Sequence, residues 1–435
     1  MLSIARIARI VSGVVAMICI AAPALAADRD EELRILREDN ERMREDLRDQ
    51  AERIDALEGK PEAEPIAHVG ASLLEVVVAG VPIRLTGFIK GDMLWNDARV
   101  DSTSAPRFAD ARRTGGDDQF TATVQHTRLG LVFGRVPIGS GTIGGLIELD
   151  FFNLSDSGDN NFNNNQLRTR LLYMDLEFGN WSIIAGQAWD LVSPLNPDSL
   201  NTNGNRWFGG NAGFRRPQLQ VARKIVWAKD SPLTLKGSIN ANIGATTSVS
   251  GKTFDSGRRS GMPVFEAAIE QSLPGCGAGP IRFGFAGFYG EEDLKGVDNG
   301  IKQWMYGAYV VVPIVDWLTL TGEIQTGKNT DALLTGGGIN TTTGNGIKST
   351  SGWIQATLTP IDDFTFNVLY GLDDRRNSNL AAGAAKKNQV VSANVKYQIF
   401  DPLVIGLEYQ NFNTDYKADR DATAHMGWVS MIFSF

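Results

Sequence analysis

Between residues 84 and 435 the sequence consists of successive strand-like segments in which apolar and polar residues alternate with a repeat of two. In the first run Ile89 and Met93 alternate with Lys90 and Asp92. Successive side chains of a strand point to opposite faces, so this repeat predicts strands with one apolar and one polar face. Strands that separate lipid from a polar lumen have this pattern. Past the N-terminal segment no run of 18 apolar residues occurs, so strands must do any spanning of a bilayer.

The runs and the breaks between them predict a closed transmembrane barrel. Sixteen strands are expected, near residues 84–96, 119–134, 142–152, 166–178, 181–189, 216–227, 232–243, 263–272, 280–290, 301–312, 315–326, 350–360, 363–372, 388–399, 402–412 and 424–435. Strand numbers of fourteen and eighteen are the alternatives, and an even number is typical of bacterial barrels. Tight breaks such as 179–180 alternate with long polar loops such as 153–165, as short periplasmic turns and long outer loops do. The fold class is therefore an all-β transmembrane antiparallel β-barrel, and a soluble sandwich is the alternative.

The first 26 residues have the composition of a signal peptide. Arg6 and Arg9 precede the apolar run 10–23, and Ala24-Leu25-Ala26 provides a small-residue cleavage site. A membrane anchor is the alternative, but the run is shorter than the roughly 20 residues that span a bilayer. Cleavage after Ala26 would leave Cys276 as the one cysteine, which excludes a disulfide framework.

Residues 27–60 are expected to form a periplasmic coiled-coil helix. Apolar residues recur with 3-4 spacing, and the seam positions are Leu33, Leu36, Asn40, Met43, Leu47, Gln50, Ile54 and Leu57. A single helix this polar would have only marginal stability in water, which favours self-association. A single solvated helix and a disordered charged linker are the alternative interpretations. Residues 61–83 are a linker or strap, and the sequence leaves undecided whether 76–81 joins the barrel.

Charge and motifs argue against nucleic acid, a cofactor, a metal or an enzymatic site. Beyond residue 64 the chain carries 32 basic and 35 acidic residues, too balanced for a nucleic-acid partner. The histidines His68, His126 and His425 form no ligand pair, and no Ser or Cys lies in a nucleophile motif. The Gly-rich segment 139–144 lies between two strands and is a turn rather than a dinucleotide site.

Arginines near the loop 191–214 are the strongest candidates for function. A loop folded into a wide barrel would narrow an otherwise open aqueous channel, and charges at the narrowing would set ion preference. The candidate constriction residues are Arg168, Arg170, Arg206, Arg215, Arg216 and Gln218, with Lys90, Asp92, Glu148 and Asp150 as opposing lumen charges. Arginines that face these carboxylates across the lumen would favour anionic solutes. The alternative is that the arginines neutralise lumen acids and stiffen the wall.

The order of these parts resembles the DcaP-like trimeric porins. The motifs that carry the resemblance are Gly87-Phe88-Ile89-Lys90-Gly91-Asp92, Leu167-Arg168-Thr169-Arg170, Ala185-Gly186-Gln187-Ala188-Trp189 and Gly213-Phe214-Arg215-Arg216-Pro217-Gln218. The resemblance implies a homotrimer with a sixteen-stranded pore in each protomer, and uptake of small anions that include dicarboxylates. It also implies that Arg168, Arg170, Arg215 and Arg216 line the constriction. Leu171-Leu172 departs from the family, which has an aromatic residue or His after the second arginine.

These features predict an outer-membrane porin for passive diffusion of small hydrophilic solutes, with a preference for anions of the dicarboxylate type. The expected partners are outer-membrane lipid, further copies in a homotrimer and small solutes such as carboxylates. Two alternatives are a non-conducting barrel that tethers the membrane and an outer-membrane enzyme. Single-channel conductance separates them.

Overall fold

The computed structural model describes residues 75–435 apart from 103, 111–117, 153–165, 203–205, 245, 250–251, 276–278, 295–299 and 341–342. The expected signal peptide, the expected coiled coil, His68 and Cys276 lie outside this part of the chain.

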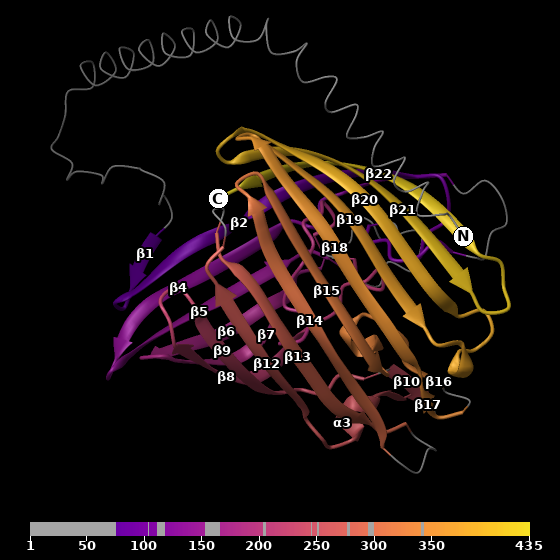
Figure 1. Ribbon diagram of the computed structural model, residues 1–435, viewed down its shortest axis with the longest axis horizontal. Coiled ribbons are helices and arrows are strands. Elements are labelled where there is room, and N and C mark those ends of the chain that lie inside the picture. The colour runs from indigo at the N-terminus through magenta and orange to yellow at the C-terminus, as the bar shows by residue number, and fades with distance from the viewer. Residues whose placement is uncertain are drawn as a thin grey trace, which may run out of the picture. The chain divides into compact units, whose positions relative to one another are not determined.

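Sixteen antiparallel strands close into one barrel (Figure 1). The wall strands are β2 (Val81–Asn96), β3 (Gln119–Thr123) continued by β4 (Arg128–Ile138), β5 (Gly141–Asp150), β6 (Arg168–Phe178), β7 (Trp181–Trp189), β8 (Arg215–Val226), β9 (Pro232–Asn240), β12 (Val264–Leu273), β13 (Ile281–Glu292), β14 (Ile301–Val315), β15 (Leu318–Lys328), β18 (Lys348–Ile361), β19 (Phe364–Arg375), β20 (Ala385–Phe400), β21 (Leu403–Tyr416) and β22 (Ala422–Ser434). Each strand pairs with the next, and β2 pairs with β22 to close the wall. The predicted fold class and all sixteen strand positions are confirmed.

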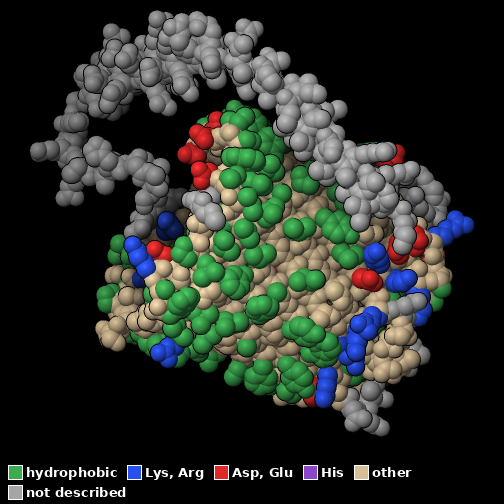
Figure 2. All heavy atoms as spheres, viewed as in Figure 1, with side chains coloured by type: hydrophobic (Ala, Val, Ile, Leu, Met, Phe, Trp, Pro, Cys, Tyr) green, Lys and Arg blue, Asp and Glu red, His purple; other side chains and the backbone are tan. Residues whose placement is uncertain are grey.

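The alternation along each strand separates an apolar outer face from a polar inner face. On β2, Ile89 and Met93 are more than half exposed, whereas Lys90 and Asp92 are buried. In Figure 2 apolar side chains cover the middle of the wall, where the hydrocarbon of a bilayer would lie. No helix in the described ranges is both long and apolar enough to span a membrane.

The two ends of the barrel differ. At one end two-residue connections such as Gly179-Asn180 join neighbouring strands, and at the other end the segments 97–118, 190–214 and 329–347 are long. The long segments hold the smaller elements β10 (Thr246–Val249), β11 (Lys252–Asp255), α3 (Ser256–Arg259), η1 (Asp331–Leu333), β16 (Ile339–Asn340), β17 (Asn345–Gly346) and η2 (Asn377–Asn379). The two ends are called the turn end and the loop end below.

Two local departures from regular strands matter for the site. The short strand β1 (Glu75–Val78) pairs with Val81–Arg84 of β2, so this part of the expected strap forms a hairpin with the wall. The predicted strand 119–134 is interrupted at residues 124–127, and β2 pairs first with β4 and then with β3. Gln125 and His126 are buried at this interruption, which has the effect of a β-bulge because it changes which residues of the strand face inward.

Candidate functional site

The segment 190–214 folds back so that its two ends meet. The backbone N–H of Asp190 donates to the carbonyl of Phe214 at 2.9 Å, and that of Phe214 donates to Asp190 Oδ2 at 2.9 Å. Between these ends the segment contacts inward-facing residues of β12, β15, β18, β20 and β21. It therefore lies against the inner wall and is called the constriction loop below.

Three buried glutamates of the wall hold the constriction loop by its backbone. Glu266 on β12 accepts a hydrogen bond from Leu191 N at 2.6 Å, and Glu323 on β15 accepts one from Leu195 N at 2.8 Å. Glu408 on β21 accepts one from Leu200 N at 2.5 Å. Ser193, Ser199 and Arg206 of the loop add side-chain contacts to Glu323 and Glu408. Each buried carboxylate thus gains donors that offset its loss of hydration.

Glycines let the loop backbone approach the wall closely. A Cβ on Gly371 of β19 would lie 1.8 Å from the carbonyl oxygen of Gly209, and a Cβ on Gly210 would lie 2.2 Å from that of Gly352. Gly210 also has φ +117°, which side chains rarely tolerate. No larger residue fits at these positions unless the loop moves.

Two further segments of the loop end pack on the constriction loop. Gly213 N donates to Leu333 O at 2.8 Å, and Phe208 N donates to Leu334 O at 2.9 Å. The amide of Asn388 on β20 donates to Phe208 O at 2.8 Å and to Arg107 O at 2.7 Å. The constriction loop is therefore fixed by the wall and by residues 97–110 and 329–347.

Arg168 and Arg170 on β6 pair with carboxylates of the neighbouring strand β5. Arg168 binds both oxygens of Asp150, at 2.9 and 2.6 Å. Arg170 binds Glu148 Oε1 at 2.6 Å and Asp150 Oδ2 at 3.0 Å. The expectation that these acids face the arginines across the lumen is wrong, because Asp150 and Arg168 are register partners on adjacent strands.

Arg215 lies beside this cluster and pairs with no carboxylate of the described residues. Its side chain is 3% exposed and its guanidinium lies over the rings of Trp189 and Phe214, at 5.0 and 5.1 Å. Arg128, Arg168, Arg170 and Asp150 are its charged neighbours. Its Nη1 atom is buried with no hydrogen-bond partner in the described part of the chain.

Arg128 belongs to the same cluster and was missed from the sequence. Its Nη2 donates to Thr202 O of the constriction loop at 2.7 Å, its guanidinium lies 5.5 Å from the Phe88 ring, and its buried Nε lacks a partner among the described residues. The four arginines of the cluster (Arg128, Arg168, Arg170 and Arg215) face two acids, Glu148 and Asp150. The cluster has a net charge of about +2, since guanidinium groups stay protonated.

The remaining predicted constriction residues hold parts of the protein together. Arg216 Nε binds both oxygens of Asp190 at 2.9 and 3.0 Å, and its Nη2 donates to Ala332 O at 2.9 Å. Arg206 is buried against Glu408 and donates to Ser392 Oγ at 2.9 Å. The Gln218 amide donates to the carbonyls of Ala188 and Trp189, each at 2.9 Å.

Lys90 and Asp92 form a separate buried group on β2. Lys90 pairs with Asp92, which also accepts from Trp428 Nε1 at 2.9 Å and Ser430 Oγ at 2.5 Å. His126 Nδ1 lies 3.3 Å from Asp92 Oδ2. Asp92 is thus neutralised within its own strand and does not oppose the arginines.

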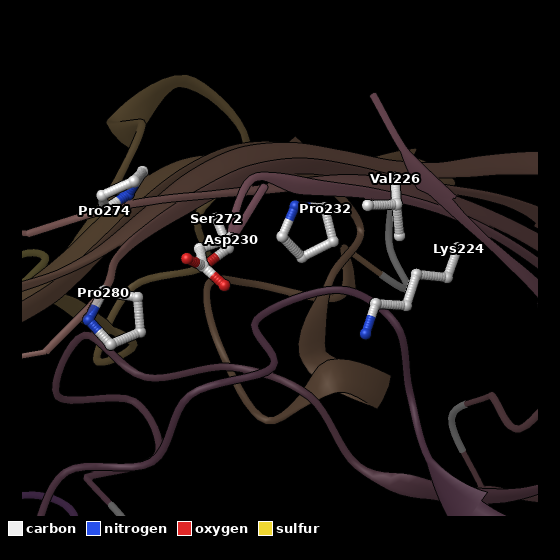
Figure 3. A pocket seen from close by; sticks show the side chains of 7 residues that line it. All are labelled: Lys224, Val226, Asp230, Pro232, Ser272, Pro274 and Pro280. Atoms are coloured by element: carbon white, nitrogen blue, oxygen red, sulfur yellow. The ribbon is translucent and has the colours of Figure 1, made fainter. Parts of the chain in front are cut away.

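The described residues also line cavities outside the arginine cluster. A pocket of about 570 Å³ opens at the turn end between Lys224, Asp230 and three prolines (Figure 3). No group of three or more His, Cys, Asp and Glu side chains among the described residues is arranged to hold a metal ion.

The comparisons with known proteins agree with this architecture. Residues 302–433 match the family model described as Gram-negative porin. No curated protein sequence matches the chain. The outer-membrane channel DcaP of Acinetobacter baumannii superposes with a TM-score of 0.66 at 21% identity, covering 82% of this chain and 98% of that one.

Two further solved structures share the fold. The Salmonella typhi OmpF complex with daunomycin has a TM-score of 0.56 at 14% identity and covers 83% of this chain and 100% of that one. An anion-selective porin from Comamonas acidovorans has a TM-score of 0.53 at 13% identity, with coverage of 82% and 100%. Together with the motifs, these matches confirm the resemblance at the level of the fold: the barrel has the fold of the DcaP channel, and its C-terminal third matches the Gram-negative porin model.

Proposed function

We propose that this protein is an outer-membrane channel through which small hydrophilic solutes diffuse, with a preference for anions. A closed barrel with an apolar outer face and a polar lumen supports a channel, and the constriction loop supports selection among solutes. The proposal includes a homotrimer and a periplasmic coiled coil at residues 27–60.

The observation that carries the anion preference is the excess of arginine over carboxylate at the constriction. Arg215 and Arg128 have no ion pair, and each has one buried nitrogen without a hydrogen-bond partner in the described part of the chain. Because these nitrogens are buried, the two guanidinium groups act on a passing anion through their positive charge. A cation meets two uncompensated positive charges at the same place and is disfavoured.

Carboxylates are the anions that the site fits best. A guanidinium presents parallel N–H groups that match both oxygens of a carboxylate. Arg128 and Arg215 are two positive charges without an ion pair among the described residues, which would favour a solute with two carboxylates. The porin from Comamonas acidovorans, which shares the fold, is anion-selective, and this is consistent with the proposal.

The test is the reversal potential of single channels in a salt gradient. The wild-type protein is expected to favour chloride over potassium, and Arg128→Gln with Arg215→Gln is expected to lower that preference severalfold. Arg223→Gln is the matched control, because Arg223 lies over Trp181 near the turn end and its loss should leave selectivity unchanged. Equal selectivity in the double variant and the wild type would contradict the role of these arginines.

The same recordings separate the alternative functions and the solute class. A barrel that inserts into the bilayer but gives no conductance steps would favour the tether over the channel. Block of the chloride current by succinate at lower concentration than by acetate, with no block by glucose, is the expected result for a dicarboxylate preference. Equal block by all three would leave a channel without the proposed solute class.

A further inference from the structure

A row of basic side chains lies on the outer face of the barrel at the loop end. Lys302 on β14, Lys328 on β15 and Lys348 on β18 each end or begin their strand on this side. Each lysine is separated by an even number of residues from an exposed apolar residue of its own strand, namely Tyr306, Ile324 and Ile354. Side chains at such a spacing share a face of the strand, so all three lysines lie on the outer face. In Figure 2 Lys and Arg gather at the loop end beside the apolar band.

The height of this row matches the boundary of the apolar band. Lys302 lies two residues beyond Trp304, and Trp304 stacks on Tyr306 with ring centroids 5.7 Å apart. Trp304 is the register partner of Lys328. Aromatic side chains of this kind mark the level of lipid headgroups. The three lysines therefore lie at the headgroup level or just above it.

The row is a concentration of like charge around Lys328 and Lys348. Lys328 and Lys348 are direct register partners on adjacent strands, and like charges placed opposite each other destabilise a sheet. In the described ranges none of the three ammonium groups has an ion-pair partner. Exposed Arg376 follows β19 beside the row, where its backbone N–H donates to Lys348 O at 2.8 Å. The nearby acids are Glu291, opposite Lys302, and Asp374, opposite Lys387.

The opposite end of the same strands carries the opposite charge. The turns at the turn end expose four aspartates, Asp316, Asp362, Asp363 and Asp401. On β14, β15, β18 and β19 the exposed aspartates of the turns thus lie at the end opposite the row of lysines.

We propose that Lys302, Lys328 and Lys348 form a binding site for the phosphate groups of a phosphorylated lipid in the outer leaflet. Lysine ammonium groups bind phosphate as compact charges, and basic residues at the headgroup level attract anionic lipids. The acyl chains of such a lipid would lie along the apolar band below the row. The site rests on the proposed function only in requiring that the barrel span a membrane with its loop end outward.

The test uses the full-length protein in detergent with three probes: bisphosphorylated lipid A, the same lipid A after dephosphorylation, and inorganic phosphate. Native mass spectrometry and thermal melting are the readouts. Wild-type protein should bind bisphosphorylated lipid A, and Lys328→Gln with Lys348→Gln should weaken that binding at least tenfold. Lys224→Gln with Lys229→Gln is the matched control, because both lysines lie near the turn end, away from the row.

The outcomes distinguish this proposal from the channel function. Unchanged lipid A binding in the Lys328/Lys348 variant would overturn the site. Equal binding of the dephosphorylated lipid, or binding of inorganic phosphate as tight as that of lipid A, would overturn the assignment to a lipid phosphate. The conductance of the variant should equal that of the wild type, so loss of lipid binding with normal conductance supports the site and leaves the proposed channel intact.

Discussion

Arg216 and Asp190 form an ion pair in which both side chains are 0% exposed. The pair joins the first residue after β7 to the second residue of β8, and therefore closes the base of the constriction loop. We expect Arg216→Met to lower the free energy of unfolding by about 3–5 kcal/mol, because the carboxylate of Asp190 is left buried and unpaired. Denaturation in detergent followed by tryptophan fluorescence measures the loss.

The double variant Asp190→Leu with Arg216→Met is the control for this pair. Replacing both charges with apolar groups removes the unpaired carboxylate, so most of the lost stability should return. If the double variant is no more stable than Arg216→Met alone, the pair is not the source of the effect. Arg216 thus differs from its neighbour Arg215, whose guanidinium lies over aromatic rings and holds no carboxylate of the described residues.

Gly371 controls how closely the constriction loop approaches the wall. A Cβ at this position would meet the carbonyl oxygen of Gly209 at 1.8 Å, so Gly371→Ala should displace the loop. We expect the single-channel conductance to change by tens of per cent and the current to become noisier. Gly427→Ala on β22 is the matched control, since a Cβ there meets no atom within 4 Å. Identical recordings from the two variants would rule out close loop packing at Gly371.

At the scale of the element, the constriction loop is held by carboxylates spaced around the inner wall. Glu408 accepts from Leu200 N and Ser199 Oγ and pairs with Arg206. We expect Glu408→Ala to free this part of the loop, because Arg206 loses its ion-pair partner inside the barrel. Conductance should rise, and limited proteolysis should cut the loop faster than in the wild type.

Glu177→Ala is the control for Glu408, because Glu177 is exposed near the turn end and pairs with Arg135. It removes the same charge without touching the loop. A proteolysis rate in Glu408→Ala that equals the rate in Glu177→Ala would show that the loop is held by other contacts.

The wall strands were predictable from the sequence because their pattern depends on neighbours in the chain. The limits of β7, residues 181–189, coincide with the prediction, since lipid and lumen impose a repeat of two along each strand. Arg128 escaped prediction because the interruption at residues 124–127 changes which residues face inward. Strand register decides that Asp150 pairs with Arg168. It also sets the height of Glu266, Glu323 and Glu408 along the inner wall, and alternation alone does not determine register.

At the scale of the whole molecule, the barrel closes through its first and last strands. Gly87 and Phe435 exchange two backbone hydrogen bonds of 3.0 Å, and register pairing continues from Phe88 and Ser434 to Asn96 and Met426. Closure leaves no strand edge of the described wall exposed to lipid, where an unpaired backbone group has no water to bind. The folded barrel therefore needs no second copy to satisfy its backbone, and the proposed self-association would need another source.

The predicted coiled coil is the feature that would drive self-association. Leu36 and Leu47 lie at predicted seam positions of residues 27–60, so Leu36→Asn with Leu47→Asn should weaken the predicted pairing of helices. We expect the melting temperature of the proposed trimer, followed by light scattering in detergent, to fall by several degrees while each barrel stays folded and conducting. Glu38→Gln with Glu45→Gln, at positions away from the seam, should leave the trimer unchanged. A trimer that melts at the same temperature in both variants would assign assembly to the barrel walls instead of the coiled coil.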